Sequence, residues 1–286
     1  MDKYSKVLIT GADGFTGRYL RITLAAHGFE CLSLGCDLLD KEAVLTRVLS
    51  VAPDYVVHLA GMSFAAEKNI AALYDVNVSG TLNLLNALRQ LPSPPNKVIL
   101  ASSANVYGAT GKTRLDETLQ PKPLNHYGCS KLSMEHMAQN HFEFLPIIIT
   151  RPFNYTGVSH DIRFLIPKIV DAYRKNLPLI ELGNLGVSRE FNDVRDVVNV
   201  YRLLLTSSLQ SDVVNICSGE STSLLSIIGL MDEMAHCEIK ITTRKEFSRD
   251  YEIKDLAGDM KKLSSVIDYS FEYKVKDTLT WMFKFC

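Results

Sequence analysis

Short apolar runs alternate with amphipathic stretches along the first half of the chain, and this alternation restricts the possible folds more than any other feature. The runs at 6–10, 54–61, 97–103 and 146–152 are strand-sized and rich in β-branched residues. Helical patterns at 18–28, 77–89 and 126–142 separate them. Strands separated by helices form βαβ units, in which helices cover a parallel sheet. We therefore expect an α/β fold with a doubly wound parallel sheet, and less regular segments from about residue 154.

The composition is typical of a globular protein that binds neither nucleic acid nor membrane. Of 286 residues, 47% are hydrophobic and 22% are charged, and 31 Lys and Arg nearly balance 32 Asp and Glu. A binder of nucleic acid or anionic membrane would show a basic surplus. We expect no secretory signal and no membrane helix, because no apolar run approaches the roughly 20 residues that a span requires. Six cysteines without CxxC spacing predict reduced thiols, no metal site and a cytoplasmic location.

A glycine-rich turn, GADGFTG (11–17), joins the first predicted strand to the first predicted helix. Glycine permits a tight turn and lets the backbone approach a pyrophosphate, which the N-terminus of the following helix attracts. A turn that needs only a positive φ is the alternative explanation, because a lone glycine triplet is a weak signal. The position of Gly11, Gly14 and Gly17 at the first βα turn favours a Rossmann-like dinucleotide-binding domain.

A further predicted strand, FECLSL (29–34), follows the first helix, and its end bears on which dinucleotide is bound. An acidic residue there would bind the ribose hydroxyls of NAD(H), but this chain has Gly35 at that place. Arg18 follows the third glycine and is a candidate to bind the 2′-phosphate of NADPH, with a solvent-facing position as the alternative. We therefore favour NADPH, with NADH as the second possibility. Asp37, in the sequence DLLD, is a candidate contact to adenine.

A tyrosine and a lysine in YGCSK (127–131) form the second chemical motif. Tyr127 and Lys131 stand at i and i+4 and therefore share one face of the predicted helix. A phenol has a pKa of about 10, which a nearby ammonium group lowers. Ser103, at the end of a neighbouring strand, can hydrogen-bond a substrate oxygen. The three side chains suit proton transfer to a carbonyl while a nicotinamide moves hydride, and an ordinary surface pair is the alternative explanation for Tyr127 and Lys131.

The chain resembles the extended short-chain dehydrogenase/reductase family, also called the NAD-dependent epimerase/dehydratase family. Further motifs carry the resemblance, namely HLAG (58–61), NVSGT (77–81), SSANVYG (102–108), RPFNYTG (151–157), SREFNDVRD (188–196) and NICSG (215–219). Within the family, the chain is most similar to the nucleotide-activated 4-keto-6-deoxyhexose reductases, of the GDP-6-deoxy-mannose and 6-deoxy-talose type. The resemblance implies a homodimer. It also implies a dinucleotide-binding domain at 1–153 plus about 192–218, and a smaller C-terminal nucleotide-sugar-binding α/β subdomain at about 154–191 and 219–286.

The resemblance assigns roles to matching residues. Tyr127 would donate a proton, Ser103 would orient the substrate oxygen, and Lys131 would hold the nicotinamide ribose and lower the pKa of Tyr127. The nucleotide-diphosphate sugar would contact Ser103, Asn105, Asn154, Arg189 and Arg249. A surface salt bridge with neighbouring Glu190 is the alternative explanation for Arg189. The cofactor would contact Gly11, Gly14, Phe15, Thr16, Gly17, Arg18, Asp37, Leu38, Leu59, Ala60, Asn77, Tyr127 and Lys131.

The serine loop, residues 102–108, differs from that of the family's dehydratases. Those enzymes carry an Asp–Glu pair directly after the serine, and the 3,5-epimerase-reductases carry a cysteine, whereas this chain has Ala104 and Asn105. Side chains that do not ionise near neutral pH cannot act as general bases, so elimination and C–H epimerisation are disfavoured.

What remains is an NAD(P)-dependent oxidoreductase that acts on the C4 ketone of a dTDP- or GDP-linked 4-keto-6-deoxyhexose. Its product would be a 6-deoxyhexose donor, such as 6-deoxy-talose or rhamnose, for surface polysaccharide. A nucleotide-sugar 4-epimerase with tightly bound NAD needs the same three side chains and is the first alternative. A non-catalytic NADP-sensing module is the second alternative, although such proteins usually lose the tyrosine or the lysine.

Overall fold

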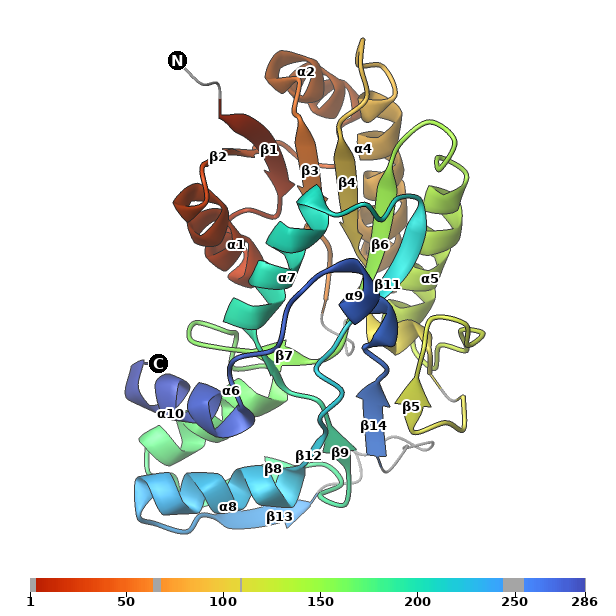
Figure 1. Cartoon of the computed structure of the whole chain (residues 1–286). Helices are drawn as coiled ribbons and strands as arrows, with labels where there is room; N and C mark the ends of the chain where they lie inside the picture. The colour runs from red at the N-terminus through yellow and green to blue at the C-terminus, as the bar shows by residue number, and fades with distance from the viewer. Residues whose placement is uncertain (1–3, 64–67, 109, 244–254, 286) are drawn as a thin grey trace.

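A six-stranded parallel sheet forms the upper half of the molecule in Figure 1, as the alternating sequence pattern predicts. The computed structural model describes residues 4–63, 68–108, 110–243 and 255–285. Along the sheet the strand order is β11-β6-β4-β3-β1-β2, and every neighbouring pair is parallel. The bounds are β1 (Ser5–Thr10), β2 (Phe29–Ser33), β3 (Tyr55–His58), β4 (Lys97–Ala101), β6 (Ile147–Pro152) and β11 (Asp212–Ile216).

Helices cover both faces of this sheet, which confirms the doubly wound prediction. On one face α1 (Phe15–Ala26) and α7 (Val194–Thr206) pack together, and on the other α2 (Lys41–Val51), α4 (Thr81–Leu88) and α5 (His126–Gln139) do so. Side chains along a strand alternate between the two faces. Val7 and Ile9 of β1 therefore join the core under α1 and α7, whereas Leu8 joins the core under α2, α4 and α5.

The strand order reverses at β1: β2 lies on one side of it, and β3 and the later strands lie on the other. In such sheets the ligand crevice lies outside the carboxyl ends of the strands, at the point where the strand order reverses. β2 is last in the strand order and therefore forms an edge of this sheet, and residues 34–40 connect it to α2. Arg47 of α2 caps that edge, because its Nε and Nη2 donate to the carbonyl oxygen of Ser33 at 3.2 and 2.9 Å.

The lower half of Figure 1 is a smaller α/β unit with its own core. Its helices are α6 (Leu165–Arg174), α8 (Leu224–Ala235) and α10 (Val275–Phe285), and β8 (Leu179–Leu182) pairs in parallel with β13 (Lys240–Thr243). Short strands join the halves: β7 (Tyr155–Thr156) pairs with β10 (Asn192–Asp193), and a four-stranded sheet has the order β12 (Thr222–Ser223), β9 (Ser188–Arg189), β14 (Asp255–Gly258) and β5 (Arg114–Leu115). Helix α9 (Lys261–Val266) returns to β11.

The predicted helix at 77–89 is part of a longer helical region, but this region is not one regular helix. From Ile70 it consists of α3 (Ile70–Tyr74), a π-helical stretch (Asp75–Gly80) and then α4. π-Helical turns inside helices occur often at functional sites. Here the stretch contains the sequence NVSG, whose residues contact both the cofactor side and the catalytic helix, as described below.

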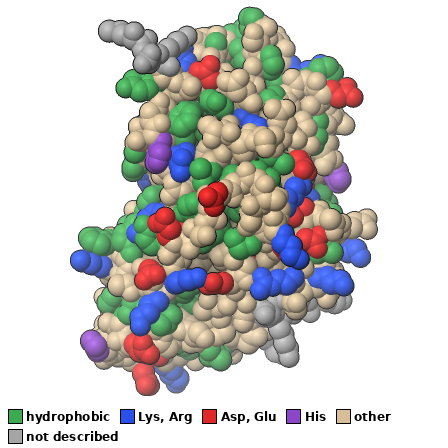
Figure 2. Space-filling view, viewed as in Figure 1, with side chains coloured by type: hydrophobic (Ala, Val, Ile, Leu, Met, Phe, Trp, Pro, Cys, Tyr) green, Lys and Arg blue, Asp and Glu red, His purple; other side chains and the backbone are tan. Residues whose placement is uncertain are grey.

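The surface seen in Figure 2 has no large patch of only positive or only negative side chains. Acidic and basic side chains intermingle there, mainly over the lower half. None of the helices in the described part of the chain is long and apolar enough to cross a bilayer. Cys31, Cys36, Cys129, Cys217 and Cys237 are free thiols, which agrees with the prediction of reduced cysteines for these five.

Candidate active site

The glycine turn forms a close junction between β1, the loop after β3 and the N-terminus of α1. Gly11 has a φ of +67°, and a Cβ atom there would lie 2.8 Å from the backbone nitrogen of Ala60. A Cβ on Gly17 would collide with the carbonyl oxygen of Gly11. Gly14 caps α1, and no acidic residue occupies the first turn of that helix. The helix therefore presents backbone N–H groups and the positive end of its dipole, and these suit a pyrophosphate.

The DLLD segment, which the sequence assigns to adenine, is held against helix α4. Asn83 Nδ2 donates to the carbonyl oxygen of Leu38 at 2.8 Å. Gly80 lets the same segment pack closely, because a Cβ atom there would lie 3.0 Å from Leu38 Cβ. Asp37 Oδ1 accepts from the backbone of Leu39 at 2.9 Å, which fixes the turn locally. Gly80 of the NVSGT motif therefore allows the DLLD segment to pack closely against this helical region.

Two arginines lie near the cofactor side, and sequence inspection singled out only one of them. Arg18 is exposed, and its Nη2 lies 3.5 Å from the carbonyl oxygen of Ser159. Arg47 is held at the end of β2, where the ribose of a dinucleotide binds in Rossmann-like folds. Its Nη1 has no hydrogen bond to another residue in the described part of the chain. Arg47 was missed because it stands ten residues beyond Asp37, inside a helix.

A buried histidine organises the loop after β3. Thr81 Oγ1 donates to the carbonyl oxygen of Asn77 at 2.8 Å, so it accepts from His58 Nε2, also at 2.8 Å. His58 Nδ1 then accepts from Thr10 Oγ1 at 2.7 Å, and Thr10 Oγ1 accepts from the backbone of Ala60 at 3.0 Å. Burial, with a smaller effect from Lys131, lowers the pKa of His58 to about 3. The imidazole is therefore neutral and holds Leu59 and Ala60 beside the glycine turn.

Asn77 links this loop to the catalytic helix. Its Oδ1 accepts from the backbone of Met62 at 2.9 Å, and its Nδ2 donates to Met62 O at 3.1 Å and to Ser130 Oγ at 3.0 Å. Ser130 Oγ in turn donates to the carbonyl oxygen of Tyr127 at 2.8 Å. The side chain of Asn77 is thus fully used in positioning, and its contact to the cofactor stays a prediction.

Tyr127 and Lys131 lie on one face of α5, one turn apart, as the spacing predicts. Both are buried, with 8% and 6% of their surface exposed, so the alternative of a surface pair is wrong. Lys131 Nζ donates to the carbonyl oxygen of Ala101 at 2.8 Å. A Cβ on Gly61 would lie 3.2 Å from Lys131 Nζ, so the loop after β3 passes directly over the amine. Burial lowers the pKa of Lys131 to about 8, and Glu135 acts in the opposite direction.

The expected lowering of the Tyr127 pKa is wrong. Burial raises the pKa of Tyr127 to about 12, a hydrogen bond from Ser103 lowers it partially, and Tyr155 raises it further. The reason is that the phenol is enclosed by the protein, and the loss of solvation of a phenolate outweighs the neighbouring donors. At neutral pH the phenol is therefore protonated, which suits a proton donor.

Ser103 stands at the end of β4, where the serine loop begins with a short 3₁₀ turn (Ala104–Val106). Its hydroxyl oxygen accepts from the backbone nitrogen of Asn105 and from Asn105 Nδ2, both at 3.1 Å. The loop packs against α5, since a Cβ on Gly128 would lie 2.7 Å from the carbonyl oxygen of Asn105. Ser103, Tyr127 and Lys131, the three predicted catalytic residues and below the catalytic trio, thus come from one strand end and one helix that are in contact.

A buried ion pair lies one helical turn beyond Lys131 and links α5 to β6. Arg151 of β6 donates from Nε and Nη2 to Glu135 of α5 at 3.0 and 2.7 Å, and both side chains are almost fully buried. Ser102 Oγ donates to the same carboxylate at 2.5 Å. Tyr107 lies under the guanidinium group and donates to Asn215 Oδ1 at 2.7 Å. Sequence analysis missed this network, although Glu135 continues the spacing of Tyr127 and Lys131 by one more turn.

The predicted sugar-nucleotide contacts lie at the junction of the two halves. Asn154 is exposed, and its carbonyl oxygen accepts from the backbone of Asn192 at 2.9 Å. Arg189 Nη1 donates to the carbonyl oxygen of Ser188 at 2.7 Å. Glu190 is fully buried and accepts from the backbone of Ser218 and Gly258, at 2.9 and 2.5 Å. The alternative of a surface salt bridge between Arg189 and Glu190 is therefore wrong, because the Glu190 carboxylate is buried. Arg249 lies outside the described residues.

The glycine turn also contacts the segment RPFNYTG. Thr16 Oγ1 and the Tyr155 hydroxyl are hydrogen-bonded at 2.8 Å. The Phe15 ring stacks on His160 with centroids 4.2 Å apart, and His160 stacks on Phe164 at 4.4 Å. Phe15 and Thr16, predicted as cofactor contacts, therefore join the dinucleotide side to the smaller unit.

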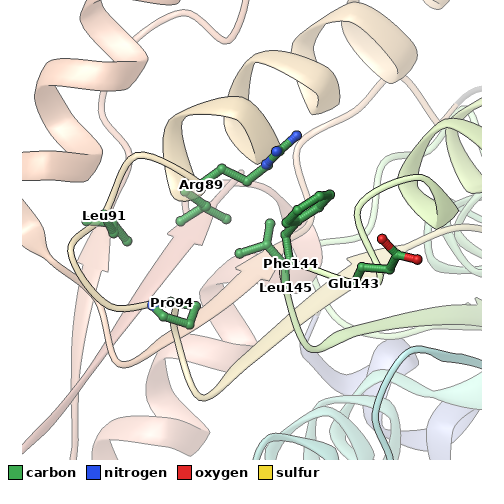
Figure 3. Close-up of a pocket in the computed structure, with 7 residues that line it drawn as sticks. Arg89, Leu91, Pro94, Glu143, Phe144 and Leu145 are labelled. Carbon is green, nitrogen blue, oxygen red and sulfur yellow. The ribbon is translucent and has the colours of Figure 1, made fainter.

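A separate hollow of about 370 Å³ lies between the C-terminal end of α4 and the chain after α5 (Figure 3). The Arg89 guanidinium stacks on the Phe144 ring at 3.8 Å. The lining contains none of the predicted site residues; it consists of Leu88, Arg89, Leu91, Pro94, Glu143, Phe144 and Leu145.

The glycine turn and the predicted catalytic trio lie at the carboxyl edge of a Rossmann-like sheet, the arrangement expected of an extended short-chain dehydrogenase/reductase. Residues 32–282 match the family described as GDP-mannose 4,6 dehydratase, and the chain belongs to this family. The predicted resemblance is thereby confirmed. The family's name describes an elimination, for which this chain has Ala104 and Asn105 in place of the acid–base pair.

The relatives found are enzymes of nucleotide-sugar metabolism. The chain is 35% identical to the GDP-6-deoxy-D-talose 4-dehydrogenase of Aggregatibacter actinomycetemcomitans, over 98% of this chain and 97% of the relative. It is 30% identical to the GDP-6-deoxy-D-mannose reductase of Pseudomonas aeruginosa, over 96% of this chain and 94% of the relative. The solved structure of RMD from Pseudomonas aeruginosa complexed with NADPH superposes with a TM-score of 0.88 at 29% identity, covering 98% of this chain and 97% of that one.

Proposed function

We propose that this protein reduces the C4 ketone of a GDP- or dTDP-linked 4-keto-6-deoxyhexose, with NADPH as the preferred cofactor and NADH as the second possibility. The product would be a 6-deoxyhexose such as 6-deoxy-talose or rhamnose. The observation that carries this proposal is a buried serine, tyrosine and lysine site whose tyrosine is protonated and whose loop has no ionisable acid–base pair. The two relatives above act, by their names, on GDP-linked 6-deoxyhexoses.

The chain offers a site for each part of the dinucleotide. The glycine turn and the first turn of α1 would hold the pyrophosphate, the DLLD segment the adenosine, and Lys131 the nicotinamide ribose. When bound, the cofactor supplies the hydride. Every other part of the chemistry falls to side chains of this chain.

Each member of the catalytic trio has one task. Tyr127 delivers its phenolic proton to the oxygen at C4, which becomes a hydroxyl. Ser103 donates a hydrogen bond to that oxygen and holds it within reach of the phenol. Lys131 carries a positive charge below pH 8, and this charge stabilises the phenolate left after proton transfer. Asn154, Arg189 and Arg249 are proposed to bind the sugar nucleotide, because arginine matches phosphate geometry.

The protonation state of Tyr127 suits ketone reduction. Reduction needs a protonated donor, and a pKa of about 12 supplies it throughout the neutral range. The names of the two relatives describe opposite directions, a reductase and a dehydrogenase, and an enzyme accelerates both. We also propose that the enzyme acts as a homodimer in the cytoplasm.

The test is the loss of absorbance at 340 nm with purified protein, NADPH or NADH, and a panel of GDP- and dTDP-4-keto-6-deoxyhexoses. We expect stoichiometric loss with NADPH and with one sugar strongly preferred. A 4-epimerase would give no net loss, would retain NAD on purification and would interconvert UDP-hexoses. A protein that binds NADPH and gives neither reaction would be the non-catalytic module.

Cofactor choice is tested by the two arginines. If Arg47 or Arg18 binds the 2′-phosphate, its replacement by Gln should weaken binding of 2′,5′-ADP about tenfold and leave binding of 5′-AMP unchanged, because a hydrogen bond to a charged group contributes about 1.5–3 kcal/mol. Isothermal titration calorimetry of both variants separates the two candidates. Equal binding of both ligands by the wild-type protein would instead favour NADH.

A further inference from the structure

Both acceptor positions of Ser103 are occupied by a single residue, Asn105. The serine oxygen accepts from the backbone nitrogen and from Nδ2 of Asn105, each at 3.1 Å. A hydroxyl has two lone pairs and one hydrogen. With both lone pairs occupied, the remaining O–H can act only as a donor.

The surroundings keep this arrangement in place. Ser103 has only 6% of its surface exposed, so water does not compete freely for its oxygen. The 3₁₀ turn that carries Asn105 is pressed against the catalytic helix at Gly128, next to Tyr127. The effect of Ser103 on Tyr127 agrees with this geometry. Its hydrogen bond lowers the pKa of the phenol, as a hydroxyl that donates to the phenol oxygen does.

We propose that Asn105 is a positioning residue that fixes Ser103 as a hydrogen-bond donor to the oxygen at C4 of the substrate. The inference rests on the proposed ketone reduction. A negative charge develops on that oxygen when hydride reaches C4, and a fixed donor stabilises it without reorganisation. Ser103 keeps its own hydrogen throughout, and the proton that completes the alcohol comes from Tyr127.

The amide is what distinguishes this role from ordinary turn chemistry. Any residue other than proline at position 105 can keep the backbone hydrogen bond that caps the 3₁₀ turn, but only a side-chain donor occupies the second lone pair. A carboxylate at the same place would accept from Ser103 and turn its hydrogen away from the substrate. The position that provides the base in the family's dehydratases thus serves here to orient the serine.

The test compares Asn105→Asp with Asn105→Leu, and with Asn125→Asp as a matched control. Asn125 caps the catalytic helix by accepting from the backbone of Gly128 at 2.8 Å, and Asp can accept in the same way. For Asn105→Asp at pH 8 we expect kcat to fall about 100-fold, the loss that follows removal of one transition-state donor, with the NADPH Kd unchanged. As the pH is lowered kcat should recover, because a protonated carboxyl donates again.

Asn105→Leu should lose about tenfold in kcat at every pH. It removes the donor to one lone pair of Ser103, so the serine hydroxyl can rotate and its hydrogen is no longer fixed toward the substrate. Asn125→Asp should keep the wild-type rate and pH profile. An Asn105→Asp enzyme with wild-type kcat at pH 8 would overturn the inference. So would an Asn105→Leu enzyme with wild-type kcat, which serves if the Asp variant does not fold. A wild-type protein without reductase activity would overturn the proposed function itself, and this inference with it.

Discussion

The catalytic trio and the proposed sugar contacts differ sharply in how firmly the fold holds them. Ser103, Tyr127 and Lys131 are each at least nine-tenths buried. Networks through His58, Asn77 and Glu135 reach the loops and strands around them. Asn154, in contrast, is exposed at the junction with the smaller unit. If the proposed roles hold, the rigid upper half carries the reaction, and the more exposed junction binds the sugar nucleotide.

The largest effect is expected at the centre of the buried site. Tyr127→Phe removes the proton donor and keeps the ring, so kcat should fall about 10³-fold, within the range for general acid catalysis. Binding of NADPH, followed by calorimetry, should stay within about twofold of wild type. A variant that keeps more than a tenth of the wild-type kcat would show that another group delivers the proton.

The buried ion pair should dominate stability. Glu135→Gln leaves the Arg151 guanidinium without its counter-charge, and loss of one partner of a buried pair costs about 3–5 kcal/mol. Urea unfolding gives the free energy directly. Asp171→Asn is the matched control, since its i,i+4 pair with Lys175 in the smaller unit is partly exposed and contributes about 0.5 kcal/mol or less. Equal losses in the two variants would contradict the contrast between the regions.

Sugar recognition should respond differently from catalysis. Arg189→Gln removes a proposed phosphate contact, so KM for the sugar nucleotide should rise about tenfold while kcat changes less than about threefold. Steady-state kinetics with the preferred substrate provides both constants. An effect confined to kcat would place Arg189 with the catalytic trio. It would contradict the division between a buried catalytic region and a sugar-binding junction.

The pH dependence should report Lys131 and not Tyr127. The pKa of Lys131 is lowered to about 8, so its positive charge is complete below that pH and is lost as the pH rises through it. The pKa of Tyr127, at about 12, lies beyond the range in which the enzyme can be assayed. Thus kcat/KM should decline above pH 8, by up to about tenfold per unit. Lys131→Arg should move this limb to higher pH, and an unmoved limb would assign it to another group.

Local sequence signals predicted the parts of the site that lie within one element or at its end. The glycine turn stands between a strand and a helix, Ser103 ends a strand, and Tyr127 and Lys131 share a helix face. Each of these positions follows from strand or helix periodicity alone. The doubly wound sheet was predictable for the same reason.

The rest of the site depends on contacts between residues far apart in the chain. His58 is held by Thr10 and Thr81, which are 48 and 23 residues away, and no spacing rule connects them. The direction of the Tyr127 pKa was missed because sequence shows the nearby lysine but not the burial of the phenol. Glu190 seemed to be a partner for its neighbour Arg189, whereas the fold turns the carboxylate inward to Ser218 and Gly258.

The most direct test of the central claim follows the hydrogen atoms. The reaction is run once with NADPH deuterated at the transferred position in H₂O, and once with unlabelled NADPH in D₂O, and the sugar is examined by NMR. We predict one deuterium at C4 in the first experiment, and in the second no deuterium at C3 or C5 above an enzyme-free control. Enzyme-dependent incorporation of solvent deuterium at C3 or C5 would contradict a serine loop without acid–base chemistry, as would the absence of cofactor deuterium at C4.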